Sequence, residues 1–412
     1  MNWPNATPPG THMPGTHAPG TGGSWGGERP YDPRYAPLHA VPNPTGRPMI
    51  RRWLLGGIIV VGFALLASVF AATFNASFGV RVSLFAVLLS AVPLGIVIPV
   101  FLWLDRFEAE PTRYLLTAFG WGALGAAFFA GVLNTTAQIV LGASGDESAA
   151  GAVTAVIVAP ITEESFKGLF LVLLLIVGRR ELNGLTDAIV YAGIVAAGFA
   201  FTENILYLGQ AYTDFGSEAL LQTFVLRGIA SPFIHPLFTV MTGIGIGIAL
   251  STRSILVRIV APITGWCLAV LMHGLWNLSA IAGPGSFALA YVVGLAVLVS
   301  FMAFVVWVRA REGRLIAVHL QPYVDTGWLS VGEVVMLSSM RQRREARTWA
   351  KFNGGERGLE TMQAFQDTAT ELALLRARMH LRSADPASLE CERRLLDSMT
   401  VRRRQLAGTS LR

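Results

Sequence analysis

The sequence predicts an all-α membrane protein, a polytopic bundle of about eight transmembrane helices. Hydrophobic residues make up 53% of the 412 residues and charged residues only 14%, whereas a soluble domain carries about 25% charged residues. Long apolar runs follow one another from Trp53 to Val308, and a helix needs roughly 20 apolar residues to cross a bilayer. The length alone would allow two or three soluble domains, but this composition excludes them.

Residues 1–49 are rich in proline and glycine and contain hardly any apolar clusters. Such a segment buries too little surface to offset its chain entropy, so we expect a disordered leader. It lacks the pattern of a secretory signal peptide, and the first apolar run is therefore predicted to be retained as an anchor. Cys267 and Cys391 lie in an apolar run and in the charged C-terminal region, which excludes a disulfide framework.

The transmembrane domain is predicted over residues 50–310. Its apolar runs are each near or above the length of a bilayer-spanning helix, and the third and sixth are long enough to be tilted. We place eight spans at 53–74, 82–104, 114–141, 152–177, 186–208, 222–250, 259–281 and 286–308.

The loop arginines predict the orientation of these spans, because short cytoplasmic loops retain basic residues. Every second loop is basic, with Arg51, Arg52, Arg106, Arg113, Arg179, Arg180, Arg253, Arg258, Arg309, Arg311 and Arg314. In the loops between them, Arg81 is the only basic residue. Both termini are therefore expected in the cytoplasm of a multi-pass cell-membrane protein.

Residues 311–412 are predicted to form a basic, helical cytoplasmic tail. The tail holds 17 basic and 12 acidic residues, so 17 − 12 = +5 of the net charge of +6 lies here. An amphipathic stretch at 331–350, a glycine-containing break at 353–358 and charged helical patterns at 359–381 and 387–406 follow one another. The arginines of the tail either contact anionic lipid or form an ordinary solvated helix face. No nucleic-acid partner is expected.

Few ionisable residues lie inside the spans, and a charge at the centre of a membrane helix costs about 2.5–3.5 kcal/mol on insertion scales. Each is therefore a candidate functional residue, although a structural ion pair is the ordinary alternative. Two of them, near span ends, are interpreted as interfacial anchors: Asp187 and Arg227. The others are Glu163, Glu164, Lys167, Glu203, His235 and His273.

Lys167 is one of only two lysines in the chain. Glu163 and Glu164 precede it by four and three residues, which places both carboxylates on its helix face. Lys167 can keep one carboxylate ionised while the other serves as a general base. Mutual neutralisation of the three charges is the alternative.

His235 and His273 are the only histidines inside the predicted spans, and they lie on different spans. Thr239 and Asn277 follow them by one helical turn as hydrogen-bonding companions. Two histidines together with glutamates suit a metal site or a catalytic cluster better than a lone core histidine does.

Depth in the membrane brings four of these residues together. At 1.5 Å per residue, Glu163, Glu203, His235 and His273 fall between the midplane and the outer face on four separate spans. We therefore expect a single site. Prolines next to His235 predict a broken helix, which the membrane tolerates only where it lines protein or a wet cavity.

Four ordered motifs carry a resemblance to a known family. EESFK, FAFTEN, HPLFT and HGLWN begin at Glu163, Phe199, His235 and His273 and resemble the motifs of the PrsW family of intramembrane metalloproteases. This family is related to the type II CAAX prenyl endopeptidases and the bacteriocin-processing membrane proteases. The likeness covers roughly residues 50–310, which would then be the protease domain. It implies peptide-bond hydrolysis within or at the membrane, with an anti-sigma factor as the best-known kind of substrate.

The resemblance also implies residue roles. Glu163 would be the general base, and His273 and Asn277 the oxyanion donors. Glu203 and His235 would be supporting or metal-binding groups. The implied catalytic set is Glu163, Glu164, Lys167, Glu203, His273 and Asn277, and the implied metal ligands are His235, His273 and Glu203. The CAAX relatives have a histidine in place of Glu203 and an arginine in place of Lys167.

A divalent metal, zinc in the first place, is the expected cofactor, since two histidines with a glutamate form a known catalytic zinc set. No HExxH motif is present, and a metal-free mechanism with a carboxylate base remains open.

The predicted substrate is a single-span membrane protein or a membrane-associated peptide. A proton- or metal-coupled transporter is the alternative, because intramembrane Glu and His also mark ion pathways. Inverted halves would favour a transporter, and none is evident. A non-catalytic scaffold that binds membrane peptides is a third possibility. The retention of all four motifs argues against it.

Overall fold

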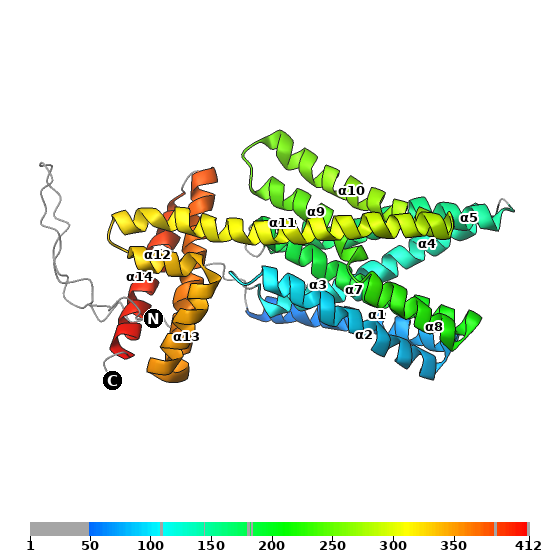
Figure 1. Cartoon of the computed structure of the whole chain (residues 1–412), viewed down its shortest axis with the longest axis horizontal. Helices are drawn as coiled ribbons and strands as arrows, with labels where there is room; N and C mark the ends of the chain where they lie inside the picture. Colours follow the sequence, from blue (N-terminus) through cyan, green and yellow to red (C-terminus); the bar gives the residue numbers. More distant parts are fainter. Residues whose placement is uncertain are drawn as a thin grey trace, which may run out of the picture. The chain divides into compact units, whose positions relative to one another are not determined.

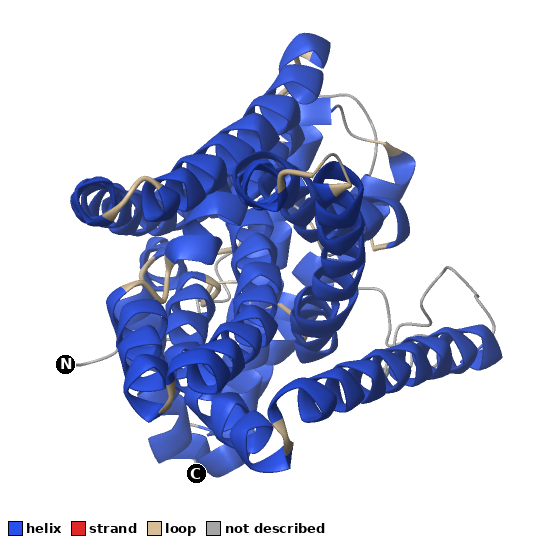
Figure 2. Ribbon diagram, turned by 90° about the vertical axis from the view of Figure 1, so that its right-hand side faces the viewer, coloured by secondary structure: helices blue, strands red, loops and turns tan. Residues whose placement is uncertain are grey.

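The computed structural model describes residues 49–107, 110–143, 145–178, 182, 184–382 and 385–409. The predicted disordered leader lies almost wholly outside these residues, as do Arg179 and Arg180. The described part contains helices and no strand, which confirms the all-α class (Figure 2). The chain divides into two units, residues 1–62 and 63–412. The helices are given below in chain order, and packing is described within the second unit.

The membrane region consists of long helices, several of them interrupted (Figure 1). In chain order they are α1 (Met49–Phe78), α2 (Val80–Leu104), α3 (Thr112–Gly120), η1 (Trp121–Ala126), α4 (Ala127–Gly142), α5 (Glu147–Val153), η2 (Thr154–Val158), α6 (Ala159–Val177), α7 (Leu185–Phe215), α8 (Ser217–Phe224), η3 (Val225–Ala230), α9 (Ile234–Leu250), α10 (Ile255–Ile281) and α11 (Pro284–Asp325).

By length and composition, seven helices of the described part can cross a membrane, against the eight predicted. They are Gly56–Phe78, Val80–Leu104, Thr112–Gly142, Leu185–Phe215, Ser217–Leu250, Ile255–Ile281 and Pro284–Asp325. The remaining predicted span, 152–177, is also helical, through η2 and α6. It carries Glu163, Glu164 and Lys167, and these three charges reduce its apolar character. The chain is a multi-pass membrane protein.

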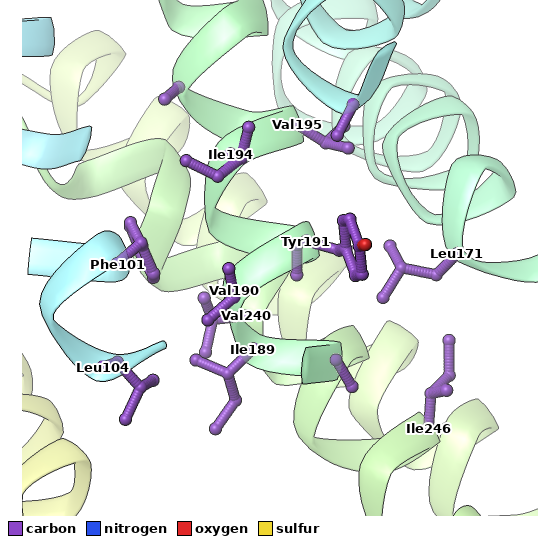
Figure 3. Packing of buried hydrophobic residues seen from close by; sticks show 14 of the residues in the cluster. Phe101, Leu104, Leu171, Ile189, Val190, Tyr191, Ile194, Val195, Val240 and Ile246 are labelled. Atoms are coloured by element: carbon purple, nitrogen blue, oxygen red, sulfur yellow. The ribbon is translucent and has the colours of Figure 1, made fainter. Parts of the chain in front are cut away.

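Helix α7 is the core of the bundle. Its residues 188–199 are buried, and a helix that is apolar all round is expected to be enclosed by other helices. It contacts α2, α9 and the α3–η1 segment. Figure 3 shows Phe101 of α2, Leu171 of α6 and Ile246 of α9 around Tyr191 of α7. Glu203, in the second half of α7, is thereby fixed relative to its neighbours.

Helices α9 and α10 approach each other at two glycines. A Cβ atom at Gly245 would collide with the carbonyl oxygen of Ala261, and one at Gly265 with that of Met241. Only glycine permits this backbone contact. The close crossing is the reason why His235 of α9 and His273 of α10 can face each other.

Three short π-helical segments, η1, η2 and η3, interrupt the spans that surround the site. π-Helical turns are rare and frequently occur at functional sites. After η3 the chain leaves helical geometry at residues 231–233, and α9 begins at Ile234. The broken helix predicted next to His235 is therefore confirmed.

The C-terminal region is helical, as predicted. It contains the end of α11, then α12 (Val331–Ser338), α13 (Met340–Arg382) and α14 (Pro386–Thr409). A reciprocal hydrogen-bonded cap between Ser330 and Glu333 starts α12. Helix α13 is interrupted at Gly355, whose φ of 61° lies in the left-handed region, within the predicted break.

Arg343 joins the tail to the connection between α2 and α3. Its side chain is fully buried and donates to the carbonyl oxygens of Leu337 at 2.8 Å, Phe107 at 3.1 Å and Gln366 at 3.3 Å. Burial lowers the pKa of this guanidinium to about 10. Arg343 therefore cannot reach lipid, whereas Arg341 and Arg344 are exposed.

The connection between α2 and α3 also contains a residue that makes the stability of the fold depend on pH. Asp105 is buried and accepts the Glu110 N–H at 2.7 Å, and burial raises the pKa of its carboxyl group to about 7. The folded state binds this proton more tightly than the unfolded state. The contribution of Asp105 to the free energy of unfolding is therefore fully present below pH 4 and is lost as the pH rises to 7.

We expect Asp105→Asn to remove this loss, because the amide oxygen still accepts the Glu110 N–H. Between pH 4 and pH 7, the free energy of unfolding of the wild type should decrease by at most about 4 kcal/mol relative to that of the variant. Thermal unfolding of both proteins in detergent, compared from pH 4 to pH 8, measures the difference. Parallel pH profiles would contradict the assignment.

Candidate active site

The site begins with three side chains on one face of α6. Lys167 Nζ lies 2.8 Å from Glu164 Oε1 and 3.6 Å from Glu163 Oε2. All three residues are buried, with 0%, 0% and 7% of the surface of Lys167, Glu164 and Glu163 exposed. The structure thus brings together the trio that the sequence spacing predicts.

Lys167 also joins α6 to two further helices. Its Nζ lies 3.8 Å from the ring centroid of Phe199 on α7 and 3.5 Å from His235 Nδ1 on α9. The ammonium thus contacts a carboxylate pair, an aromatic face and an imidazole in a buried space, where such contacts are stronger than in water.

Glu164 uses both of its carboxylate oxygens to hold other residues. Oε1 accepts from Lys167 Nζ and lies 3.1 Å from His273 Nδ1, and Oε2 accepts from Thr239 Oγ1 at 2.8 Å. An ionised carboxylate only accepts, so Nδ1 of His273 is the donor in this contact. Thr239, expected as a companion of His235, instead fixes Glu164.

His235 is oriented in a similar way from the other side. Its Nε2 lies 2.6 Å from Glu203 Oε2, so Nε2 donates and Nδ1 retains the lone pair. The His235 and His273 rings are 5.5 Å apart, centroid to centroid, and almost perpendicular. His273 thus has one nitrogen beside a carboxylate and the other facing Glu163. His235 has Glu203 at Nε2 and the Lys167 ammonium 3.5 Å from Nδ1, so Lys167 has to move before this Nδ1 can bind a ligand. A carboxylate that holds one ring nitrogen is the arrangement that metal-binding histidines usually show.

Glu163 differs from Glu164 in having one oxygen without a hydrogen-bond donor. Its Oε1 accepts from Asn134 Nδ2 at 3.3 Å, and Asn134 is itself held by Thr162. The buried Oε2 has no hydrogen-bond partner and lies 3.8 Å from His273 Nε2. A water, an ion or a reacting group can provide the missing partner of such a buried oxygen.

These residues fit a divalent metal. Ligand atoms of Glu163, His235 and His273 all lie within 4.8 Å of one another. Zinc bound at about 2.1 Å in tetrahedral geometry needs ligand atoms roughly 3.4 Å apart, so small movements would close this triangle. Lys167 does not oppose the ion with a free charge, because Glu164 neutralises it. The predicted ligand set contained Glu203, whereas the geometry places Glu163 in the third position.

Glu203 is held by Arg227, the residue interpreted above as an interfacial anchor. Arg227 donates from Nη2 to Glu203 Oε2 and from Nε to Asn204 Oδ1, both at 2.9 Å. Its guanidinium also stacks 3.9 Å from the ring centroid of Tyr207. Arg227 is therefore part of the site. The signal that points to it in the sequence is the cost of an arginine inside a membrane span.

Asn277 lies one turn after His273 and binds backbone. Its Nδ2 donates to the Ala155 carbonyl oxygen in η2 at 2.8 Å. A primary amide has a second N–H, which is left for a ligand. The oxyanion role of Asn277 and His273 stays a prediction.

A cavity of about 260 Å³ lies next to the cluster. Its polar lining includes Asn204, Arg227, His235 and Asn277, and most of its other walls are apolar or aromatic, including Leu94, Ala197, Phe201, Trp276 and Phe287. Such a space suits an apolar side chain of a peptide whose backbone reaches the polar groups.

Comparison with known proteins agrees with this geometry. The model of the PrsW family intramembrane metalloproteases matches residues 110–308, which include every residue of the cluster. Protease PrsW of Geobacillus kaustophilus (strain HTA426) is 30% identical over 165 residues, which cover 40% of this chain and 67% of that protein. The chain belongs to the PrsW family. It is accordingly an intramembrane protease by family, and no solved structure matches it.

The position of Arg227 leads to a prediction for this PrsW-family site. Arg227→Gln removes the cation that orients Glu203 and, through Glu203, His235. Loss of such an outer partner typically costs about 10–100-fold in activity or metal affinity. We expect a decrease of this size in kcat for cleavage of a membrane substrate, with partial recovery in Arg227→Lys. Arg81→Gln, at an exposed position of α2, should remain at the wild-type rate.

Proposed function

We propose that this protein is a metalloprotease that hydrolyses peptide bonds of single-span membrane proteins or membrane-associated peptides. The observation that carries this proposal is the buried Glu163 Oε2, which accepts no hydrogen bond and lies 3.8 Å from His273 Nε2 and 3.6 Å from Lys167 Nζ. A proton acceptor and a ligand nitrogen thus face the same small volume, deep among apolar helices.

Glu163, His235 and His273 would hold the metal, which we propose to be zinc. When bound, a divalent metal lowers the pKa of a water molecule and polarises a substrate carbonyl. Glu164 fixes the His273 tautomer, Glu203 fixes that of His235, and Lys167 balances the carboxylates. These three residues position the ligands without touching the substrate.

The proton movements follow from the same geometry. One oxygen of Glu163 would hold the metal, and its other oxygen accepts a proton from the attacking water as the water oxygen bonds to the peptide carbonyl carbon. The second N–H of Asn277 stabilises the developing oxyanion, a contact typically worth about 3 kcal/mol. When the carbon–nitrogen bond breaks, the proton on Glu163 passes to the leaving amine. A new carboxylate and a new amine result.

We propose that the site opens toward the outer half of the cell membrane, with both termini in the cytoplasm. The small cavity next to the cluster is lined by Ile281 at the end of α10 and Phe287 near the start of α11. Arg253 and Arg258 lie at the other end of α10, and Arg309, Arg311 and Arg314 lie farther along α11, among the arginines of the basic loops. Substrates with a single apolar span, anti-sigma-factor-like proteins among them, would reach the cluster from the bilayer.

Cleavage in proteoliposomes tests this function. The full-length protein is reconstituted with a labelled panel of single-span substrates, and the products are identified by mass spectrometry. We expect two fragments from at least one substrate with wild type and none with His273→Ala. Retention of substrates without cleavage would indicate a binding scaffold. Ion flux through wild-type vesicles without cleavage would indicate a transporter, and either result would overturn the proposal.

A further inference from the structure

A second, larger cavity is lined by residues other than those of the catalytic cluster and extends from Ser165 and Gly168 of α6 to the turn between α9 and α10. Its volume is about 1540 Å³, above the roughly 300–1,000 Å³ of typical small-molecule pockets. Residues of α6, α9, α10, α11 and the tail helix α13 line it, and none of the cluster residues Glu163, Glu164, Lys167, His235 or His273 does.

The rim of this cavity is positively charged. Arg253, Arg258, Arg311 and Arg378 line it together with His319 and His380. Two acidic residues, Asp187 and Glu312, offset half of the arginine charge. An excess of positive charge remains at a mouth that adjoins the α9–α10 turn, where the membrane spans end.

The wall beyond the rim is apolar. Val172 of α6 and Ile263 of α10 line it and are 44% and 55% exposed, so this groove is open along the sides of the two helices. At its inner end Trp266 Nε1 donates to Ser165 Oγ at 3.2 Å. The Thr242 Oγ1 atom there is buried and has no hydrogen-bond partner.

We propose that this cavity binds an anionic phospholipid, with the phosphate among the rim arginines and an acyl chain along α6 and α10. Basic pockets between membrane helices bind anionic lipid head groups, and an acyl chain needs no polar partner on the apolar wall. A peptide in the same groove would bring backbone N–H and carbonyl groups that require hydrogen bonds, and Ser165 and Thr242 offer few. Because α13 contributes Arg378, the bound lipid joins the tail to the membrane helices.

Native mass spectrometry of the full-length protein tests this site without any substrate, so its failure would leave the proposed proteolysis unaffected. The protein is delipidated in detergent and mixed with equal amounts of phosphatidylglycerol and phosphatidylcholine with identical acyl chains. We expect at least about tenfold preferential retention of phosphatidylglycerol. Arg258→Gln and Arg378→Gln should each weaken this preference about fivefold, as expected for one basic residue near a lipid head group.

Matched variants separate the site from general surface charge. Arg357→Gln, at an exposed position of α13, should keep the wild-type preference, and Arg258→Lys should retain most of it. Ile263→Trp fills the groove and should reduce retention of both lipids. Equal retention of the two lipids by wild type, or wild-type preference in the correctly folded glutamine variants, would overturn the proposal. So would displacement of phosphatidylglycerol by inorganic phosphate or by an acidic peptide.

Discussion

Glu163→Gln is expected to lower kcat for peptide-bond hydrolysis by about 10³-fold, the typical contribution of a positioned general base. The amide keeps the size of the carboxylate and its contact with Asn134, but it cannot take a proton from water. The variant should fold normally, because Glu164 remains to neutralise Lys167. Rates are measured with the same substrate and vesicles as for wild type. Glu147→Gln, an exposed acidic residue in α5, is the matched control.

The neighbouring Glu164→Gln should behave differently. Glu164 accepts from Lys167 and Thr239 and holds His273, so its loss leaves a buried ammonium without its main counter-charge. Breaking a buried ion pair costs about 3–5 kcal/mol. We therefore expect a lower thermal stability in addition to lost activity. Equal stability of Glu164→Gln and wild type would contradict the division of roles between the two carboxylates.

Metal dependence is the second large effect. Wild type should contain one divalent ion per chain, and chelation should stop cleavage until zinc is returned. His235→Ala and His273→Ala should each weaken metal retention by more than about 100-fold, since loss of a ligand exceeds the effect of its outer partner. Elemental analysis of the purified proteins measures the bound metal. His319→Ala, which changes a histidine of the larger cavity, is the control.

The metal experiment also distinguishes the two mechanisms that the residues allow. Full cleavage after chelation, with no metal detected, would contradict the metal site and favour a water activated by Glu163 alone. Loss of metal in Glu163→Gln but not in Glu203→Gln would support the ligand set that the geometry favours. The reverse result would return Glu203 to the position that the sequence resemblance implied.

The sequence predicts the fold to a large extent, because membrane spans follow from the length of apolar runs. The exception is 152–177, where the charges that make the site also reduce the apolar character of the helix. The break at Gly355 was likewise predictable, since a left-handed backbone favours glycine. The π-helical segments leave no periodic signal, because their sequences are as apolar as those of the α-helices around them.

The candidate site was predicted as a group of residues, but the partners within it were not. Spacing along α6 fixes Lys167 against Glu163 and Glu164. In contrast, the rotation of α7 and the break before α9 decide which atoms meet across helices. For this reason Arg227 joins Glu203, and Thr239 bonds to Glu164 and not to His235. Asn134 was also missed, because a single amide in an apolar run does not indicate which residue of another helix it contacts.

The most direct test of the central claim is a single-turnover cleavage in water labelled with ¹⁸O. If water is activated at Glu163, the new carboxylate made by wild type carries one ¹⁸O atom, and Glu147→Gln gives the same product at the same rate. Glu163→Gln, folded and with its membrane stability intact, should give no labelled product on that time scale. Labelled product from Glu163→Gln at the wild-type rate would contradict the account.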